Sequence, residues 1–209
     1  MKHIPVSDTF HAGVLSFEDA LIPTAEDYDR SRWIYIPDHY SEYRYVLGTR
    51  GTRPLICIGI NPSTAAPDRL DNTLKSAQRI ALHNGYDSFI MFNVYAQRAT
   101  LPDDMEKVLN PAMHRENMKA FDWILRQFSP PCSVWAAWGS LIMKRPYLPQ
   151  CVRDMAAIGN SRGACWFTAG PRSKDGHPHH PLYLRSDTQL DPFPDLEQYL
   201  DSLSVSKRR

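Results

Sequence analysis

The chain has 209 residues and a formal net charge of +1, and 43% of its residues are hydrophobic. This length and composition are typical of one globular domain with a sizeable core, so we expect residues 1–209 to form a single domain. No apolar run approaches the roughly 18 residues that span a membrane, and no basic start leads into an apolar stretch. We therefore expect a cytoplasmic protein with no membrane segment and no signal peptide.

The cysteines are too widely spaced for the usual metal-binding patterns. None of them forms a Cys-x-x-Cys pair, and most lie in or beside apolar runs, which favours buried, reduced thiols. The sequence pI of about 7.7 is not by itself a nucleic-acid-binding signature, although basic residues gather between positions 144 and 185. The cysteines are Cys57, Cys132, Cys151 and Cys165.

The first part of the chain predicts a short helix and a β-hairpin. Residues 14–21 have helical character with Ser16 near the start. Residues 32–36 and 43–47 are rich in aromatic and β-branched side chains, which is typical of strands. The expected divisions are residues 1–42 for an N-terminal extension with the hairpin, 43–193 for the core and 204–209 for a flexible tail.

Strands and helices then alternate, which predicts βαβ units and a mainly parallel sheet. The strands are short, apolar runs of the kind that is buried on both faces of a sheet. The helices have apolar residues at helical spacing, and the third of them is expected to be broken near Pro146 and Pro149. The expected strands are 55–59, 88–94, 133–139 and 164–168, and the expected helices are 71–84, 111–128, 141–158 and 196–203.

Polar side chains follow three of these strands. Asn61 comes just after the first, Asn93 lies near the end of the second, and a loop with His177, His179 and His180 follows the fourth. Because parallel strands share a direction, these groups are expected together at the carboxyl ends of the strands, where α/β proteins place their sites. A Pro-anchored turn at Asn61 and an exposed polar histidine loop are the plainer interpretations.

Several familiar chemistries lack their motifs. The chain has no Gly-x-Ser-x-Gly nucleophile elbow, no phosphate-binding P-loop and no Gly-x-Gly-x-x-Gly fingerprint. No carboxylate or cysteine lies at metal-ligand spacing from the histidines, so we expect neither a metal nor a cofactor.

The combined order of four short motifs resembles a bacterial domain family of unknown function, over about residues 43–193. The motifs are Asn61-Pro62-Ser63-Thr64-Ala65, Arg98-Ala99-Thr100, Ala137-Trp138-Gly139 and His180-Pro181-Leu182-Tyr183-Leu184.

The same order is similar, more distantly, to the uracil-DNA glycosylase superfamily. Gly59-Ile60-Asn61-Pro62-Ser63 resembles the first motif of its mismatch-specific branch, and Phe92-Asn93 resembles the strand whose asparagine reads a flipped base. Ala137-Trp138-Gly139-Ser140 and the His180–Leu184 run resemble two later motifs. The resemblance implies a three-layer α/β/α sandwich around a mostly parallel, four-stranded sheet, with the hairpin added at the N-terminus.

This resemblance also implies a monofunctional DNA glycosylase, which flips out a pyrimidine and hydrolyses its N-glycosidic bond. Asn61 would orient the attacking water, and His180 would donate to the base oxygen that gains charge. Asn93 would read the Watson–Crick edge, with Gly59, Ile60 and Pro62 forming the rest of the base pocket. Residues expected at the DNA are the wedge Leu184, then Arg185, Arg172, Lys174 and His177, the last also being the alternative to His180.

Ser63 bears on the substrate. The uracil-specific enzymes have a bulky tyrosine at the corresponding place, which excludes substituents at C5 of the pyrimidine. The small Ser63 predicts room for a C5-modified or otherwise enlarged pyrimidine, such as a modified cytosine of phage DNA excised in defence. The plainer interpretation is that Ser63 caps the next turn.

Two other functions remain open from the sequence. The chain can be a nucleic-acid-binding module of the same fold without catalysis, or an enzyme that acts on a free nucleoside. DNA is the expected partner, and no obligate protein partner is expected. The salt dependence of binding separates DNA from a small neutral ligand.

Overall fold

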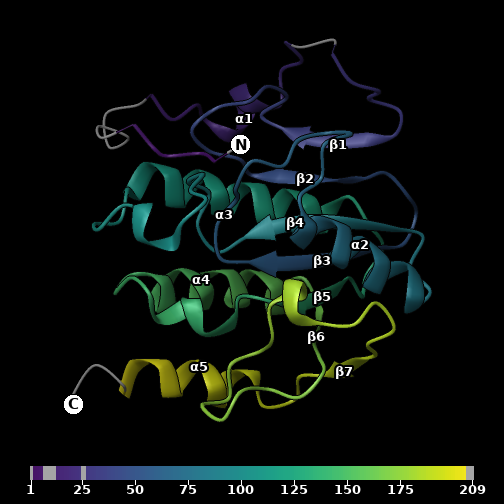
Figure 1. Ribbon diagram of the computed structural model, residues 1–209, viewed down its shortest axis with the longest axis vertical. Helices are drawn as coiled ribbons and strands as arrows, with labels where there is room; N and C mark the ends of the chain where they lie inside the picture. Colours follow the sequence, from purple (N-terminus) through teal and green to yellow (C-terminus); the bar gives the residue numbers. More distant parts are fainter. Residues whose placement is uncertain (1, 7–12, 25–26, 206–209) are drawn as a thin grey trace.

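One mixed, seven-stranded sheet forms the centre of the computed structural model, which describes residues 2–6, 13–24 and 27–205 (Figure 1). The strand order is β1-β2-β4-β3-β5-β6-β7. The strands are β1 (Trp33–Ile36), β2 (Val46–Thr49), β3 (Pro54–Gly59), β4 (Ser88–Asn93), β5 (Ser133–Ala136), β6 (Cys165–Ala169) and β7 (Leu190–Pro192). The helices are α1 (Phe17–Ala20), α2 (Asn72–His83), α3 (Pro111–Arg126), α4 (Leu148–Ser161) and α5 (Leu196–Val205).

The α/β class is confirmed, but the sheet has seven strands in the described chain rather than four. β4, β3, β5 and β6 pair in parallel, as expected, while β1, β2 and β7 add antiparallel edges. The hairpin joins the sheet because β2 pairs with β4. β7 was not predicted because it has only three residues and ends on Pro192, a residue tolerated at sheet edges.

The second hairpin strand begins later than predicted. Residues 43–45 do not pair fully with β1: Tyr43 bridges to Gln97, and the Arg44 amide donates to the Ala96 carbonyl at 2.9 Å. This stretch therefore lies beside the chain that leaves β4. That position brings Arg44 toward the carboxyl ends of the parallel strands.

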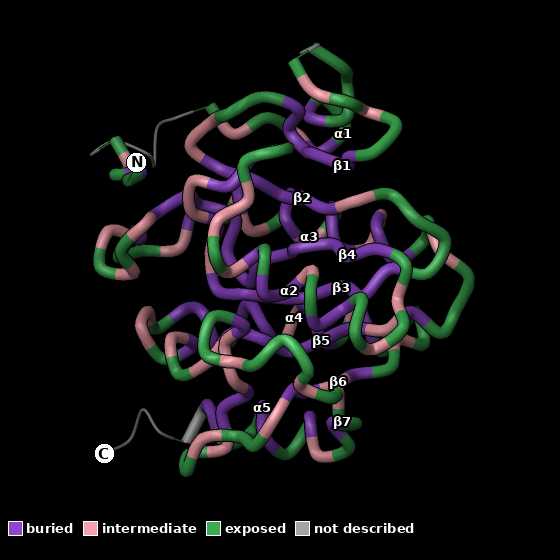
Figure 2. Tube along the Cα trace, turned by 45° about the vertical axis from the view of Figure 1, so that its right-hand side comes forward, coloured by how far each residue is buried: buried purple, intermediate pink, exposed green. Residues whose placement is uncertain are grey.

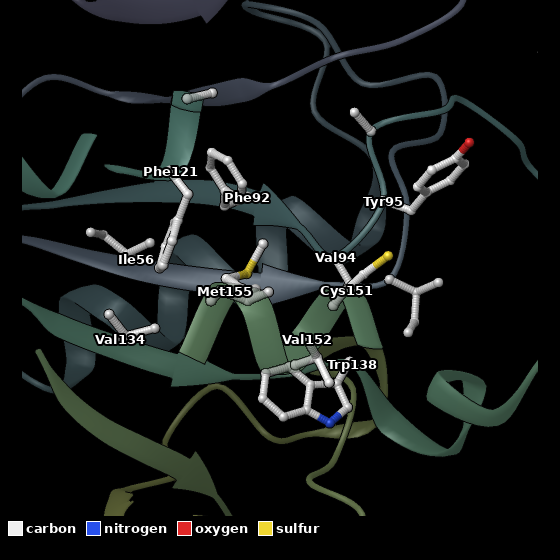
Figure 3. Close-up of a cluster of buried hydrophobic side chains, with 14 of the residues drawn as sticks. Ile56, Phe92, Val94, Tyr95, Phe121, Val134, Trp138, Cys151, Val152 and Met155 are labelled. Carbon is white, nitrogen blue, oxygen red and sulfur yellow. The ribbon is translucent and has the colours of Figure 1, made fainter. Parts of the chain in front are cut away.

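Helices cover both faces of the sheet, as the sandwich requires. Leu74, Ala77 and Ile80 of α2 pack on one face, and α3 and α4 pack on the other. Figure 3 shows Phe121 of α3 and Met155 of α4 among the side chains of that second face. The central strands β3 and β4 are buried along their whole length (Figure 2).

Strand order places a crevice at the end of β3. The chain goes from β3 through α2 to β4 on one side, and later from β5 through α4 to β6 on the other. Since α2 and α4 cover opposite faces, the connections diverge between β3 and β5. Open α/β sheets bind ligands outside the carboxyl ends of strands at such a point.

The helix ends follow from the sequence with two corrections. Asp71 caps α2 as predicted, by accepting from the Leu74 amide at 2.9 Å. Pro149 does not break α4, because it lies in the first turn, where a missing N–H costs nothing. α5 continues to Val205, so residues 204 and 205 of the expected tail are helical, and residues 206–209 lie outside the described part.

The cysteines are all free: Cys57, Cys132 and Cys151 are buried, while Cys165 at the start of β6 is exposed. Within the described residues, no helix combines the length and the apolar character needed to cross a bilayer.

Candidate functional site

A cavity of about 440 Å³ opens at the carboxyl ends of β3 and β4. This volume falls in the range of small-molecule sites. The structure brings together there most of the pocket residues expected from the sequence. They are Gly59, Ile60, Asn61, Pro62, Ser63, Asn93 and His180.

Asn93 is the most unusual of these residues. It ends β4 and is 1% exposed, yet neither its Nδ2 nor its Oδ1 has a hydrogen-bond partner in the described structure. Its backbone is fixed, since Asn117 Nδ2 donates to the Asn93 carbonyl at 3.0 Å. Buried amides are rarely left unpaired, because losing water without a replacement partner costs about 1–3 kcal/mol. The amide is therefore set up for a ligand that offers one donor and one acceptor.

Gly59 makes room for this amide. A Cβ at position 59 would lie 3.3 Å from Asn93 Oδ1 and 2.6 Å from Met91 Cε. The close approach explains why the strand ends on a residue without a side chain at the wall of the cavity.

Asn61 has a fixed orientation. Its Nδ2 donates to the Ala99 carbonyl at 2.8 Å and to the Pro62 carbonyl at 3.1 Å. The amide nitrogen is thereby used within the protein. Oδ1, an acceptor, is the atom that remains for a ligand or a water in the cavity.

His180 follows β6 and caps the 3₁₀ turn η4 (Pro181–Tyr183). Its Nδ1 accepts from the Leu182 amide at 3.4 Å, which assigns the ring proton to Nε2 and makes that atom a donor. Burial lowers the pKa of His180, and Asp71 opposes this shift only in part, so the ring is neutral at pH 7. Ser76 on α2 fixes the turn by donating to the Pro181 carbonyl at 2.7 Å.

Asp71 also lines the cavity and was not expected there. It is the carboxylate among the described lining residues, and its Oδ1 is held by the Leu74 amide. The sequence identified it only as a helix cap. Since α2 starts directly after the Asn61 loop, the residue that caps this helix lies close to the site. This position in the sequence could have indicated that Asp71 lines the cavity.

Arg44 is a second residue that the sequence analysis missed. It lines the cavity although it is only 1% exposed. Burial, with Arg98 as a second cause, lowers its pKa to about 9. The pattern of residues 43–47 predicts a plain strand and does not indicate that this side chain turns toward the site.

The residues expected at the DNA lie outside the cavity lining. Leu184 is half-buried and packs against the core, and a Cβ on Gly170 would lie 3.3 Å from it. η4 turns the chain so that Leu182 and Tyr183 are exposed at the cavity, 45% and 78%, while Leu184 packs against the core. The role of Leu184 as a wedge stays a prediction.

Most of the arginine and histidine side chains expected at the DNA have partners within the protein. Arg185 pairs with Asp187 at 3.0 Å, and Arg172 pairs with Asp195 at 2.7 Å. His177 is buried, with Nδ1 3.0 Å from the Tyr199 hydroxyl, and His180 rather than His177 lines this cavity. The expected contact of His177 with DNA stays a prediction. Lys174 is exposed on the same loop. Across the described residues, no cluster of three or more His, Cys, Asp or Glu side chains has a metal-binding arrangement.

Comparison with known protein families identifies a matching domain family. A family model described as "Protein of unknown function (DUF1643)" matches residues 44–182, which contain the strands β2–β6 and the residues that line the cavity from Arg44 to Leu182. No curated protein and no solved structure matches the chain.

Proposed function

The chain belongs to the DUF1643 family of proteins of unknown function, and we propose that it is a monofunctional DNA glycosylase whose cavity receives a flipped pyrimidine. The observation that carries this proposal is the unpaired, buried amide of Asn93 in the same cavity as Asn61 and His180. The finer fold assignment, a uracil-DNA-glycosylase-like sandwich, is part of the same proposal. It is supported by the positions of the resembling motifs: residues 59–63, Asn93 and His180 line one cavity, and Gly139 lies against His180.

Asn93 recognises the base. Its Nδ2 donates to a ring carbonyl, and its Oδ1 accepts from the adjacent ring N–H of a uracil-type edge. The same amide turned over offers the reverse pattern for a cytosine-type edge. In either case the ligand replaces the water that Asn93 lost on folding.

Asn61 orients the nucleophile. Its Oδ1 accepts a hydrogen bond from a water, while Ala99 and Pro62 hold the amide in place. An amide is a poor base, so the proposed enzyme is slower than one with a carboxylate at this position. The carboxylate of Asp71 supplies negative charge toward the cationic sugar that forms as the bond breaks.

His180 stabilises the leaving group. The hydroxyl of the water adds to C1′, the C1′–N bond breaks, and its electron pair leaves with the base, which then takes up a proton. The neutral ring donates from Nε2 to the base oxygen where this charge develops. Removing one such donor lowers turnover by about 10²–10³-fold, which is the loss that we expect for His180→Asn.

Ser63 favours an enlarged pyrimidine. Its hydroxyl lies 3.1 Å from the Thr100 hydroxyl at the cavity wall, so no bulky side chain fills this end. A second hollow of about 480 Å³ lies next to the cavity and shares Pro102, Leu141, His180 and Tyr183 with it. We expect Ser63→Tyr to abolish activity on an enlarged base, measured as base release. Unchanged turnover by that variant would remove the substrate assignment.

One observation favours a second candidate, hydrolysis of a free nucleoside or nucleotide. Arg172 and Arg185 form ion pairs within the protein and lie outside the cavity lining, so they provide few ready phosphate contacts for a long DNA strand.

The proposal is tested by incubating the protein with single-stranded and duplex DNA that carries uracil, a thymine mismatch, hydroxymethylcytosine or glucosylated hydroxymethylcytosine. Strand breaks that appear only after alkali, and that are lost in Asn61→Ala but kept in Arg79→Met on the exposed side of α2, are the expected result. Intact DNA throughout, with DNA binding equal in the parent and Asn61→Ala, would instead identify a binding module.

A further inference from the structure

Two buried arginines lie under the Asn61 loop without an acidic partner. Arg44 and Arg98 are 1% and 0% exposed, and both donate from Nη1 to the Ala65 carbonyl at 3.1 Å. The Nε of each has no hydrogen-bond partner, and neither forms an ion pair with any described residue. Two like charges that share one carbonyl repel one another, and each was taken out of water to reach this place.

The two side chains differ in how well they are satisfied. Arg98 also donates to the Ser63 carbonyl and, at 2.9 Å, to the Tyr35 hydroxyl, and its guanidinium lies 4.2 Å from the centre of the Tyr40 ring. It therefore fixes the loop. Arg44 makes one side-chain hydrogen bond, to Ala65, and it is the arginine that lines the cavity.

Asp71 is the acidic group that acts on both arginines. Asp71 is not a direct partner of either arginine, because it forms no ion pair with either guanidinium and its Oδ1 accepts from the Leu74 amide. His180, the remaining titratable group of the lining besides Tyr183, is neutral. The charge of Arg44 is thus left for something that enters the cavity.

We propose that Arg44 binds an oxyanion of the substrate, a phosphate or a carboxylate, inside the cavity. A guanidinium offers several N–H donors in one plane, which matches the oxygen geometry of both groups. The inference rests on the proposed function for the rest of the ligand: with Asn93 on the base edge, the oxyanion is either the phosphate of the reacting nucleotide or an acidic substituent on an enlarged pyrimidine.

Calorimetric titration of the full chain tests this with three ligands: deoxyuridine, deoxyuridine 5′-monophosphate and 5-carboxydeoxyuridine. We expect at least one anionic ligand to bind about tenfold or more tightly than deoxyuridine. Preference for the monophosphate identifies the phosphate as the source, and preference for the carboxylated nucleoside identifies the base substituent. Equal affinity for all three would overturn the proposal.

Variants assign the effect to one side chain. Arg44→Met should remove the preference for the anionic ligand, Arg44→Lys should keep part of it, and Arg79→Met should behave as the parent. If Arg44→Met keeps the preference for the anionic ligand, Arg44 is not the anion ligand. If Arg44→Met does not fold, an undiminished preference in Arg44→Lys leads to the same conclusion.

Inorganic phosphate separates the failure of this inference from the failure of the proposed function. Suppose that no nucleoside binds, but that phosphate raises the thermal midpoint of the parent and of Arg79→Met, raises that of Arg44→Lys less, and leaves that of Arg44→Met unchanged. The oxyanion site is then supported and the glycosylase proposal is not. If neither nucleosides nor phosphate bind, the inference is wrong.

Discussion

At the scale of single residues, the site is marked by polar groups that folding left unpaired. Asn93 and Arg44 are both almost completely buried, and both have donor atoms without partners at one cavity. Such groups are rare in folded proteins, because a buried polar group without a partner lowers the stability of the fold, whereas a buried apolar side chain does not. Their coincidence at one place indicates that the missing partner is a ligand.

Replacing Asn93 by leucine tests this directly. Leucine has a similar volume and buries no unpaired polar atoms, so we expect Asn93→Leu to raise the free energy of unfolding by about 1 kcal/mol while activity is lost. Denaturant unfolding measures the first effect and base release the second.

Asn117→Leu is the matched control for that variant. Its Nδ2 donates to the carbonyls of Asn93 and Val94, so this substitution should lower the free energy of unfolding by about 1–3 kcal/mol. A similar loss of stability in Asn93→Leu would mean that the Asn93 amide has a structural partner, and the argument for a ligand would not hold.

At the scale of elements, the site is formed by the exits of β3 and β4 and by the loop from β6 to η4. The two strand exits were predicted correctly, because continuous apolar runs ending in Asn and Pro specify buried strands and their ends. The loop was predicted only in outline. Which histidine faces the cavity depends on η4 and on Ser76 of α2, more than 100 residues away in the sequence, and on Gly139, whose φ is +62°.

The histidines of this loop should make stability depend on pH. Burial lowers the pKa of His177 and His180 below the ordinary value of 6.5, so the unfolded chain binds protons first as the pH falls. The free energy of unfolding should therefore hold above pH 6.5 and decrease below it, down to the folded-state pKa values.

Unfolding of the parent and of His180→Asn between pH 8 and pH 5 measures this contribution. We expect the parent to lose more stability than the variant over the acidic half of the range. A larger loss in the variant would mean that the His180 pKa is raised by folding, and that a charged ring is the form present near neutral pH.

At the scale of the whole molecule, the sequence predicted the class of the fold and most residues of the pocket. It did not predict β7, the joining of the hairpin to the sheet, or the charged side chains that line the cavity. The parallel core could be recognised because each strand carries its own apolar pattern. β7, the packing of Leu184 and the position of Arg44 in the cavity lining all depend on contacts between segments far apart in the sequence. Local sequence patterns carry no information about such contacts.

The near-neutral charge of the chain predicts a modest salt dependence of DNA binding. With a net charge of +1 and two of the expected phosphate-binding arginines in ion pairs, we expect about two to four phosphate contacts. The logarithm of the association constant should then fall with the logarithm of salt concentration with a slope of about −2 to −4. A slope near zero in a fluorescence-anisotropy titration would exclude DNA and favour a small, uncharged ligand.

The central claim is that this cavity recognises a pyrimidine and breaks its glycosidic bond. Mass spectrometry of the small molecules released from modified DNA under single-turnover conditions tests this most directly, since it identifies the bond that breaks. We predict one free pyrimidine, released by the parent and by Arg79→Met but not by Asn61→Ala or Asn93→Leu. Release of a nucleotide instead of a base, or equal release by Asn61→Ala, would contradict the account.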